Sequence, residues 1–244
     1  MLELEARAEP SRLMAWASPL LAVALMLVGG LAVFAALGKD PVEGFRVFFL
    51  NPVKDLYALS ELLLKATPLM LCAIGLAIGF RANVWNIGAE GQFMLGAVAA
   101  TGVALYFGDA ESALVLPAMV LAGAAGGAAW AAIPALLRTR FNANEILVSL
   151  MLVYVAQLFV SWLVLALGLY LSNLLLGPWK DPDGFNFPQT RMFAEAATLP
   201  MVIEGTRLHF GFAIALAALV AGYAFMNRSH AGFRMRVAGE AADA

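Results

Sequence analysis

Six long windows without a charged residue divide this chain, and they restrict it to folds that can exist inside a membrane. A helix needs about 20 mostly apolar residues to cross the hydrocarbon core of a bilayer. The windows are evenly apolar rather than alternating, which favours helices over a β-barrel. We therefore predict an all-α, polytopic membrane protein with about six transmembrane helices. The windows are bounded by Arg12 and Lys39, Lys65 and Arg81, Glu90 and Asp109, Glu111 and Arg138, Glu145 and Lys180, and Arg207 and Arg228.

Two of these windows have unusual lengths. The one between Lys65 and Arg81 is short for a span unless it borrows from Tyr57–Leu64. The one between Glu145 and Lys180 is long enough to tilt or to leave part of itself at the interface.

Composition agrees with a membrane protein and excludes several kinds of chemistry. Hydrophobic residues make up 62% of the chain, charged residues only 13%, and the mean hydropathy is +0.83. Soluble domains carry about 25% charged residues. The net charge of -2 gives no basis for nucleic-acid binding, and Cys72 has no disulfide partner in the chain. The sequence contains no phosphate-binding G-x-x-x-x-G-K-[ST] loop, no His/Cys metal cluster and no Ser/His/Asp arrangement. We expect no catalysis, no metal and no bound cofactor.

The distribution of lysine and arginine favours an N-terminus on the inner side. The basic totals of the two sides are similar, but the compact loop at Arg138–Arg140 and the tail at 228–244 are net basic. The outer segments are long, and their acids outnumber their bases. We predict external segments at 39–65, as an amphipathic interfacial helix, and at 177–207. The second is rich in proline and reads either as an ordered loop where a soluble partner docks or as a passive connector.

A pair of glycines marks a close helix contact. Gly123 and Gly127 form a G-x-x-x-G pattern flanked by alanines. Small residues let helix backbones approach each other in lipid. We favour packing within the chain over a subunit interface.

The most unusual stretch is FRANVWNIGAEGQF, residues 80–93, which places polar residues between two apolar windows. Asn83, Asn86 and Gly88 suit helix ends rather than helix interiors, so we predict a broken helix around 83–91. Glu90 then falls in the first turn of the next helix, where a carboxylate suits the helix dipole. The stretch is either a cytoplasmic loop or an unwound segment that lines a water-filled path.

The surrounding sequence, ATPLMLCAIGLAIGFRANVWNIGAEGQFMLGA at 66–97, resembles the permease subunits of bacterial ABC importers. The resemblance is to the branch that handles nucleosides and simple sugars, within the larger group of ribose and branched-chain amino acid permeases. That branch has the core F-R-A-G-x-x-N-I-G-A-E-G-Q. Residues 86–92 match it, and Asn83 stands where glycine is common.

Two further stretches are similar to the same family. In FNANEILVSLMLVYVA, residues 141–156, Asn144 and Glu145 match a helix start, while Tyr154 replaces an asparagine. The tail AGFRMRVAGEAADA, residues 231–244, resembles the cytoplasmic loop that couples importers to their ATPase, although Ala241 and Ala242 replace Asn-Pro. The family continues with further membrane helices, so the single permease domain at 1–244 looks truncated or incomplete. The candidate coupling residues are Gly232, Arg234, Arg236 and Gly239.

The resemblance implies a subunit of the bacterial cytoplasmic membrane. Its expected partners are a separate ATP-binding subunit, a second permease subunit and an extracytoplasmic substrate-binding protein. ATP is bound by the partner subunit. The candidate residues of the translocation path and signature are Trp85, Asn86, Gly88, Glu90, Gln92, Asn144 and Glu145.

Two other functions remain open at this point. One is an ion-coupled secondary transporter in which Glu90 binds the proton. The other is a non-transporting membrane scaffold or fragment. Asn86, Gln92 and Trp85 offer polar and stacking groups to a neutral substrate if they face the path; otherwise they act as caps and helix-to-helix hydrogen bonds.

Overall fold

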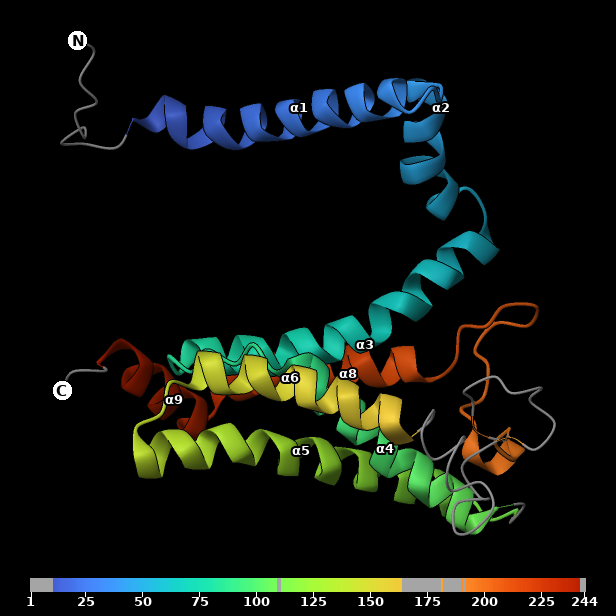
Figure 1. Ribbon diagram of the computed structural model, residues 1–244, viewed down its shortest axis with the longest axis vertical. Coiled ribbons are helices and arrows are strands. Elements are labelled where there is room, and N and C mark those ends of the chain that lie inside the picture. The colour runs from blue at the N-terminus through green and yellow to red at the C-terminus, as the bar shows by residue number, and fades with distance from the viewer. Residues whose placement is uncertain (1–10, 109–110, 164–180, 182–189, 191, 242–244) are drawn as a thin grey trace. The chain divides into compact units, whose positions relative to one another are not determined.

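The computed structural model describes residues 11–108, 111–163, 181, 190 and 192–241, and throughout this part of the chain the regular structure is helical. The chain divides into two compact units, Met1–Leu62 and Leu63–Ala244. Figure 1 shows the helices of both units, coloured along the chain.

The first unit is built around the helix α1, Arg12–Ala36. It begins at Ser11, whose hydroxyl accepts a hydrogen bond from the backbone N–H of Met14. A turn with Gly38 at a positive φ of 67° leads to the short helix α2, Pro41–Phe45, which Asp40 caps. The ring of Phe45 packs edge-on against Phe34 with the ring centroids 6.0 Å apart.

The predicted interfacial helix at 39–65 is divided into pieces. After α2 follow a π-helical turn at Arg46–Leu50 and a 3-10 turn at Asn51–Val53. The long helix α3, Leu56–Arg81, then begins well before Lys65 and takes up the last part of the segment. The short apolar window therefore does borrow from Tyr57–Leu64, because no helix-breaking residue separates them.

The second unit contains most of α3 and the helices α4 (Ala89–Phe107), α5 (Val115–Phe141), α6 (Glu145–Ser161), α8 (Gly211–Arg228) and α9 (His230–Glu240). Helix α4 packs against both α5 and α6. At its contact with α5, a Cβ atom on Gly96 would lie 2.8 Å from the carbonyl oxygen of Gly123, and one on Gly127 would lie 3.1 Å from the carbonyl oxygen of Gln92. The G-x-x-x-G pair thus packs within the chain, as predicted.

Four helices in the described part are long and apolar enough to cross a membrane: α1, α3, α5 and α8. The other two predicted windows also contain helices. Helix α4 has 19 residues, but Glu90 and Gln92 lower the hydropathy of its first turn. Helix α6 has 17 described residues. The all-α, polytopic architecture is confirmed.

Most of the predicted external segment 177–207 lies outside the described residues. Its described end contains a 3-10 turn, Glu195–Ala197 (η4), in which Ala197 is buried against Ala104 and Val115. Farther on, Met201 pairs with His209 in an isolated antiparallel bridge, just before α8 begins.

Candidate functional site

The helix break predicted around 83–91 is present, and Asn83 ends α3 in the left-handed backbone conformation, with φ of 54°. The N–H of Asn83 donates to the carbonyl oxygen of Phe80, and that of Val84 donates to Gly79. This is the Schellman pattern, which glycine usually supplies and asparagine tolerates. The position where the family commonly has glycine is therefore the one that needs a positive φ.

Helix α4 starts after Gly88, and its first turn is tied to the break by a pair of amides. Asn86 Nδ2 donates to Gln92 Oε1 at 3.1 Å, and Gln92 Nε2 donates to Asn86 Oδ1 at 3.2 Å. The Asn86 oxygen also accepts from the N–H of Gly88 at 2.8 Å. Asn86 thus forms the turn into α4 and fixes the orientation of Gln92.

Helix α6 holds the same turn from the other side. The buried hydroxyl of Ser149 accepts a hydrogen bond from the N–H of Ile87 at 3.2 Å. A Cβ atom on Gly88 would lie 3.0 Å from the carbonyl oxygen of Ser149. A glycine is needed here because the turn approaches the α6 backbone so closely. Sequence reasoning missed Ser149, which only the tertiary contact identifies.

Trp85 lies within the break, and its side chain packs against the C-terminal end of α3. Its ring lies 5.0 Å from the ring of Phe80, centroid to centroid, and its Nε1 donates to Asn83 Oδ1 at 3.1 Å. The side chain is half exposed and covers the end of α3.

Glu90 lies in the first turn of α4, as predicted, and its carboxylate accepts a hydrogen bond from Gln157 Nε2 at 3.1 Å. Gln157 is a polar side chain flanked by apolar residues of α6, which signals a contact between helices but does not identify the partner. Its neutral amide joins α4 to α6. In the described part of the chain, no ion pair to Glu90 is present.

A cavity of about 750 Å³ lies between α3, α4 and α5. The hydrogen-bonded amides of Asn86 and Gln92 line part of it. Asn86 and Gln92 are its strongest polar groups, and Cys72 contributes a thiol. Trp85, Gly88 and Glu90 do not line it. The described residues that line it are all uncharged: Leu71, Cys72, Gly75, Leu76, Asn86, Ala89, Gln92, Phe93, Gly123, Ala124, Gly127 and Ala128.

Asn144 and Glu145 lie away from this cavity, at the start of α6. The Asn144 oxygen caps the helix by accepting from the N–H groups of Ile146 and Leu147. Glu145 forms an ion pair with Arg138 at the end of α5, with nitrogen and oxygen 2.5 Å apart. These two predicted residues hold the connection between α5 and α6.

The tail forms the helix α9, and its four candidate residues have different environments. A Cβ atom on Gly232 would collide with the carbonyl oxygen of Phe225, and one on Gly239 would collide with that of Arg81. These glycines hold α9 against α8 and the end of α3. Arg236 is half buried and lines a pocket of its own chain, whereas Arg234 is exposed.

Comparison with known proteins places this chain in a family. The family model for the permease component of branched-chain amino acid transport systems matches residues 58–244. The chain is 39% identical to a glucose ABC transporter permease of Haloferax volcanii, over 98% of this chain and 62% of the relative. It is 29% identical to a guanosine ABC transporter permease of Bacillus subtilis, over 91% of this chain and 60% of the relative.

A nucleoside ABC transporter permease of Lactococcus lactis subsp. cremoris is 26% identical, over 93% of this chain and 61% of the relative. The chain thus spans between 60% and 62% of the length of these relatives. No solved structure matches it.

Proposed function

This chain belongs to the permease component family of branched-chain amino acid transport systems, and on that premise we propose that it forms the membrane-spanning path of an ATP-driven importer for nucleosides or simple sugars. The resemblance found in the signature stretch supports this function, and so do the names of the relatives that transport glucose, guanosine and nucleosides.

The observation that carries the proposal is the uncharged polar cavity between α3, α4 and α5. Its volume lies within the usual range for ligand sites, about 300–1,000 Å³. A charged substrate leaving water would need a counter-charge, and no charged residue of the described part of the chain lines this cavity. Each of the two amides keeps a second N–H donor, and the Gln92 oxygen keeps one lone pair, so the pair can still bind the hydroxyl groups that sugars and nucleosides carry.

The proposed partners follow from the same function. A separate ATPase subunit hydrolyses ATP, so this chain is not an enzyme and binds no nucleotide cofactor. A second permease subunit and an external binding protein complete the transporter, in the cytoplasmic membrane. With the N-terminus inside, α9 faces the ATPase. Arg234 is then the candidate residue that contacts it, since Gly232 and Gly239 pack on their own chain and Arg236 lines an internal pocket.

The arrangement around Glu90 argues against an ion-coupled transporter. Its carboxylate is hydrogen-bonded to an amide on α6 and does not line the cavity. A cap and helix-joining role accounts for its position. Uptake into protein-containing vesicles driven by a proton gradient, without any ATPase, would contradict the importer.

Cys72 offers a direct test because it is the only cysteine of the chain and lines the cavity. In membranes, a small water-soluble methanethiosulfonate reagent should label Cys72, since a translocation path must admit water. Guanosine or glucose, added before the reagent, should slow the labelling by at least severalfold.

Cys72→Ser measures the background labelling without any cysteine. Tyr106→Cys in the Cys72→Ser protein places a reporter cysteine at an exposed position outside the cavity. Nucleosides and sugars should leave labelling of this Tyr106→Cys reporter unchanged. A Cys72 that reacts only with membrane-permeant reagents, or that neither solute protects, would remove this cavity as the path.

A further inference from the structure

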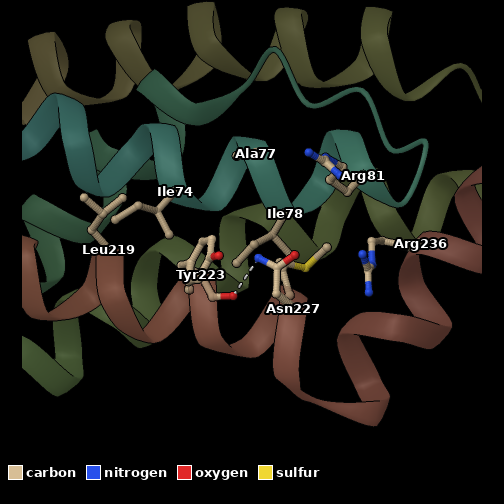
Figure 2. A pocket seen from close by; sticks show the side chains of 10 residues that line it. Ile74, Ala77, Ile78, Arg81, Leu219, Tyr223, Asn227 and Arg236 are labelled. Carbon is tan, nitrogen blue, oxygen red and sulfur yellow. Dashed lines mark hydrogen bonds between the residues drawn. The ribbon is translucent and has the colours of Figure 1, made fainter.

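A second pocket, of about 220 Å³, lies between α3, α8 and α9 in the second unit, at the end of the candidate spans α3 and α8. Figure 2 shows its lining residues. One wall is apolar and includes Ile74 of α3 and Leu219 of α8. The other end carries Arg81, Asn227 and Arg236, from three different helices.

Arg236 has a hydrogen-bond donor in this pocket that lacks an acceptor among the described residues. Its Nε atom is shielded from solvent, and in the described part of the chain no hydrogen-bond partner meets it. A guanidinium stays charged under all physiological conditions and offers five N–H donors. A shielded donor on a permanent cation is costly unless an anion or another acceptor satisfies it.

Arg81 adds a second positive charge, as the last residue of α3. Among the described residues, the ion pairs are Arg46–Glu43, Lys54–Asp55 and Arg138–Glu145, and none involves Arg81 or Arg236. The Asn227 side chain donates to the backbone oxygen of Tyr223 at 3.0 Å, as Figure 2 shows, and thus contributes a polar but uncharged group. The polar end of the pocket therefore carries two positive charges that no carboxylate of the described residues pairs.

We propose that this pocket binds the phosphate group of an anionic membrane lipid. Guanidinium groups bind phosphate through paired, charge-assisted hydrogen bonds. Basic pockets between membrane helices suit anionic head groups when they lie at the depth of the bilayer surface. This pocket lies where α3 and α8 end, and the apolar wall with Ile74 and Leu219 continues along both helices, so it can accommodate the start of an acyl chain.

The lipid is favoured over a free phosphate ion because the wall is apolar and belongs to helices long enough to cross the membrane. Lipid binding at this pocket is independent of the proposed substrate and of the direction of transport. It requires only that α3 and α8 lie in a bilayer.

Native mass spectrometry of the detergent-purified protein, titrated with phosphatidylglycerol or phosphatidylcholine, tests the proposal. The wild type should retain phosphatidylglycerol in preference to phosphatidylcholine. Arg81→Gln and Arg236→Gln should each weaken that retention about fivefold, the size expected for one basic residue at an anionic surface. The double variant should lose the preference.

Arg234→Gln is the matched control, because it removes one charge from the same helix α9 at an exposed position. Arg236→Lys keeps the charge and should retain part of the preference, which separates lipid binding from a folding defect. Equal retention of both lipids by the wild type, or an equal loss in Arg234→Gln, would overturn the proposal. So would displacement of phosphatidylglycerol by an equimolar amount of inorganic phosphate.

Discussion

The side-chain amides of Asn86 and Gln92 hydrogen-bond each other in both directions, at 3.1 and 3.2 Å, at the edge of the uncharged cavity. This pairing uses one donor of each amide and leaves each a second N–H group. The two residues can therefore hold the helix break in shape and still offer donors to a ligand. Asn86 and Gln92 can thus serve both a structural role and a role in substrate binding.

The pairing predicts a coupled effect of mutation. Asn86→Ala and Gln92→Ala should each destabilise the protein by about 1 kcal/mol, the usual net value of such hydrogen bonds. The double variant should lose clearly less stability than the sum of the two single losses, because the first substitution already breaks the hydrogen bonds between the two amides. Denaturant unfolding in mixed micelles measures the cycle. Strictly additive costs would show that the two amides act independently.

The contact between α4 and α5 predicts a severe effect of added volume at Gly96. A Cβ atom there would lie 2.8 Å from a backbone oxygen of α5, and backbone cannot move aside as a flexible side chain can. Gly96→Val should lower stability by about 1–3 kcal/mol or more, the usual range for overpacking. Thermal unfolding of the purified protein gives the comparison.

Gly29→Ala in α1 is the control, since nothing lies within 4 Å of a Cβ atom at that position. It should be neutral or slightly stabilising, because alanine is the better helix former. A similar loss in both variants would mean that α4 and α5 are not in close backbone contact at Gly96.

The left-handed conformation of Asn83 predicts opposite results for two substitutions. Asn83→Gly should change stability little, because glycine adopts a φ of 54° without strain. Asn83→Val should cost about 1–2 kcal/mol or more, since a β-branched residue is strained there. The two unfolding midpoints, measured side by side, check the difference. Equal midpoints would argue that the end of α3 rearranges.

The ion pair between Arg138 and Glu145 predicts rescue by charge exchange. The Glu145 side chain is 19% exposed and that of Arg138 39%, so the pair is partly shielded from water. Arg138→Glu alone places two acids together and should destabilise the α5–α6 connection, as should Glu145→Arg. The double exchange should recover much of the loss. Limited proteolysis at this connection provides the measurement, and additive damage in the double variant would contradict the pairing.

Much of this architecture is predictable because a bilayer demands long apolar helices and leaves few alternatives. The helix break, Glu90 in the first turn of α4 and the packing of Gly123 and Gly127 follow from local residue chemistry. The start of α3 does not follow from charge, since Lys65 continues the helix. A long lysine side chain can direct its charge toward the interface while its stem stays apolar.

The partners across helices were beyond prediction. Ser149 meets Ile87, and Gln157 meets Glu90, over separations of more than 60 residues that no local pattern encodes. The four tail residues illustrate the same limit. Motif resemblance grouped Gly232, Arg234, Arg236 and Gly239 together, whereas their different contacts depend on how α9 packs against α3 and α8.

The interlocked glycines of α4 and α5 determine which wall of the large cavity can move. Backbones in such close contact leave little room to slide past each other, so we expect α4 and α5 to move together as one block. Among the helices that border the cavity, α3 has no comparably extensive contact with that block. We therefore expect the size of the cavity to respond more readily to a displacement of α3 than to any movement between α4 and α5. Because a Cβ atom on Gly239 would collide with the carbonyl oxygen of Arg81, α9 lies directly against the end of α3, and a displacement of either helix must be accommodated by the other.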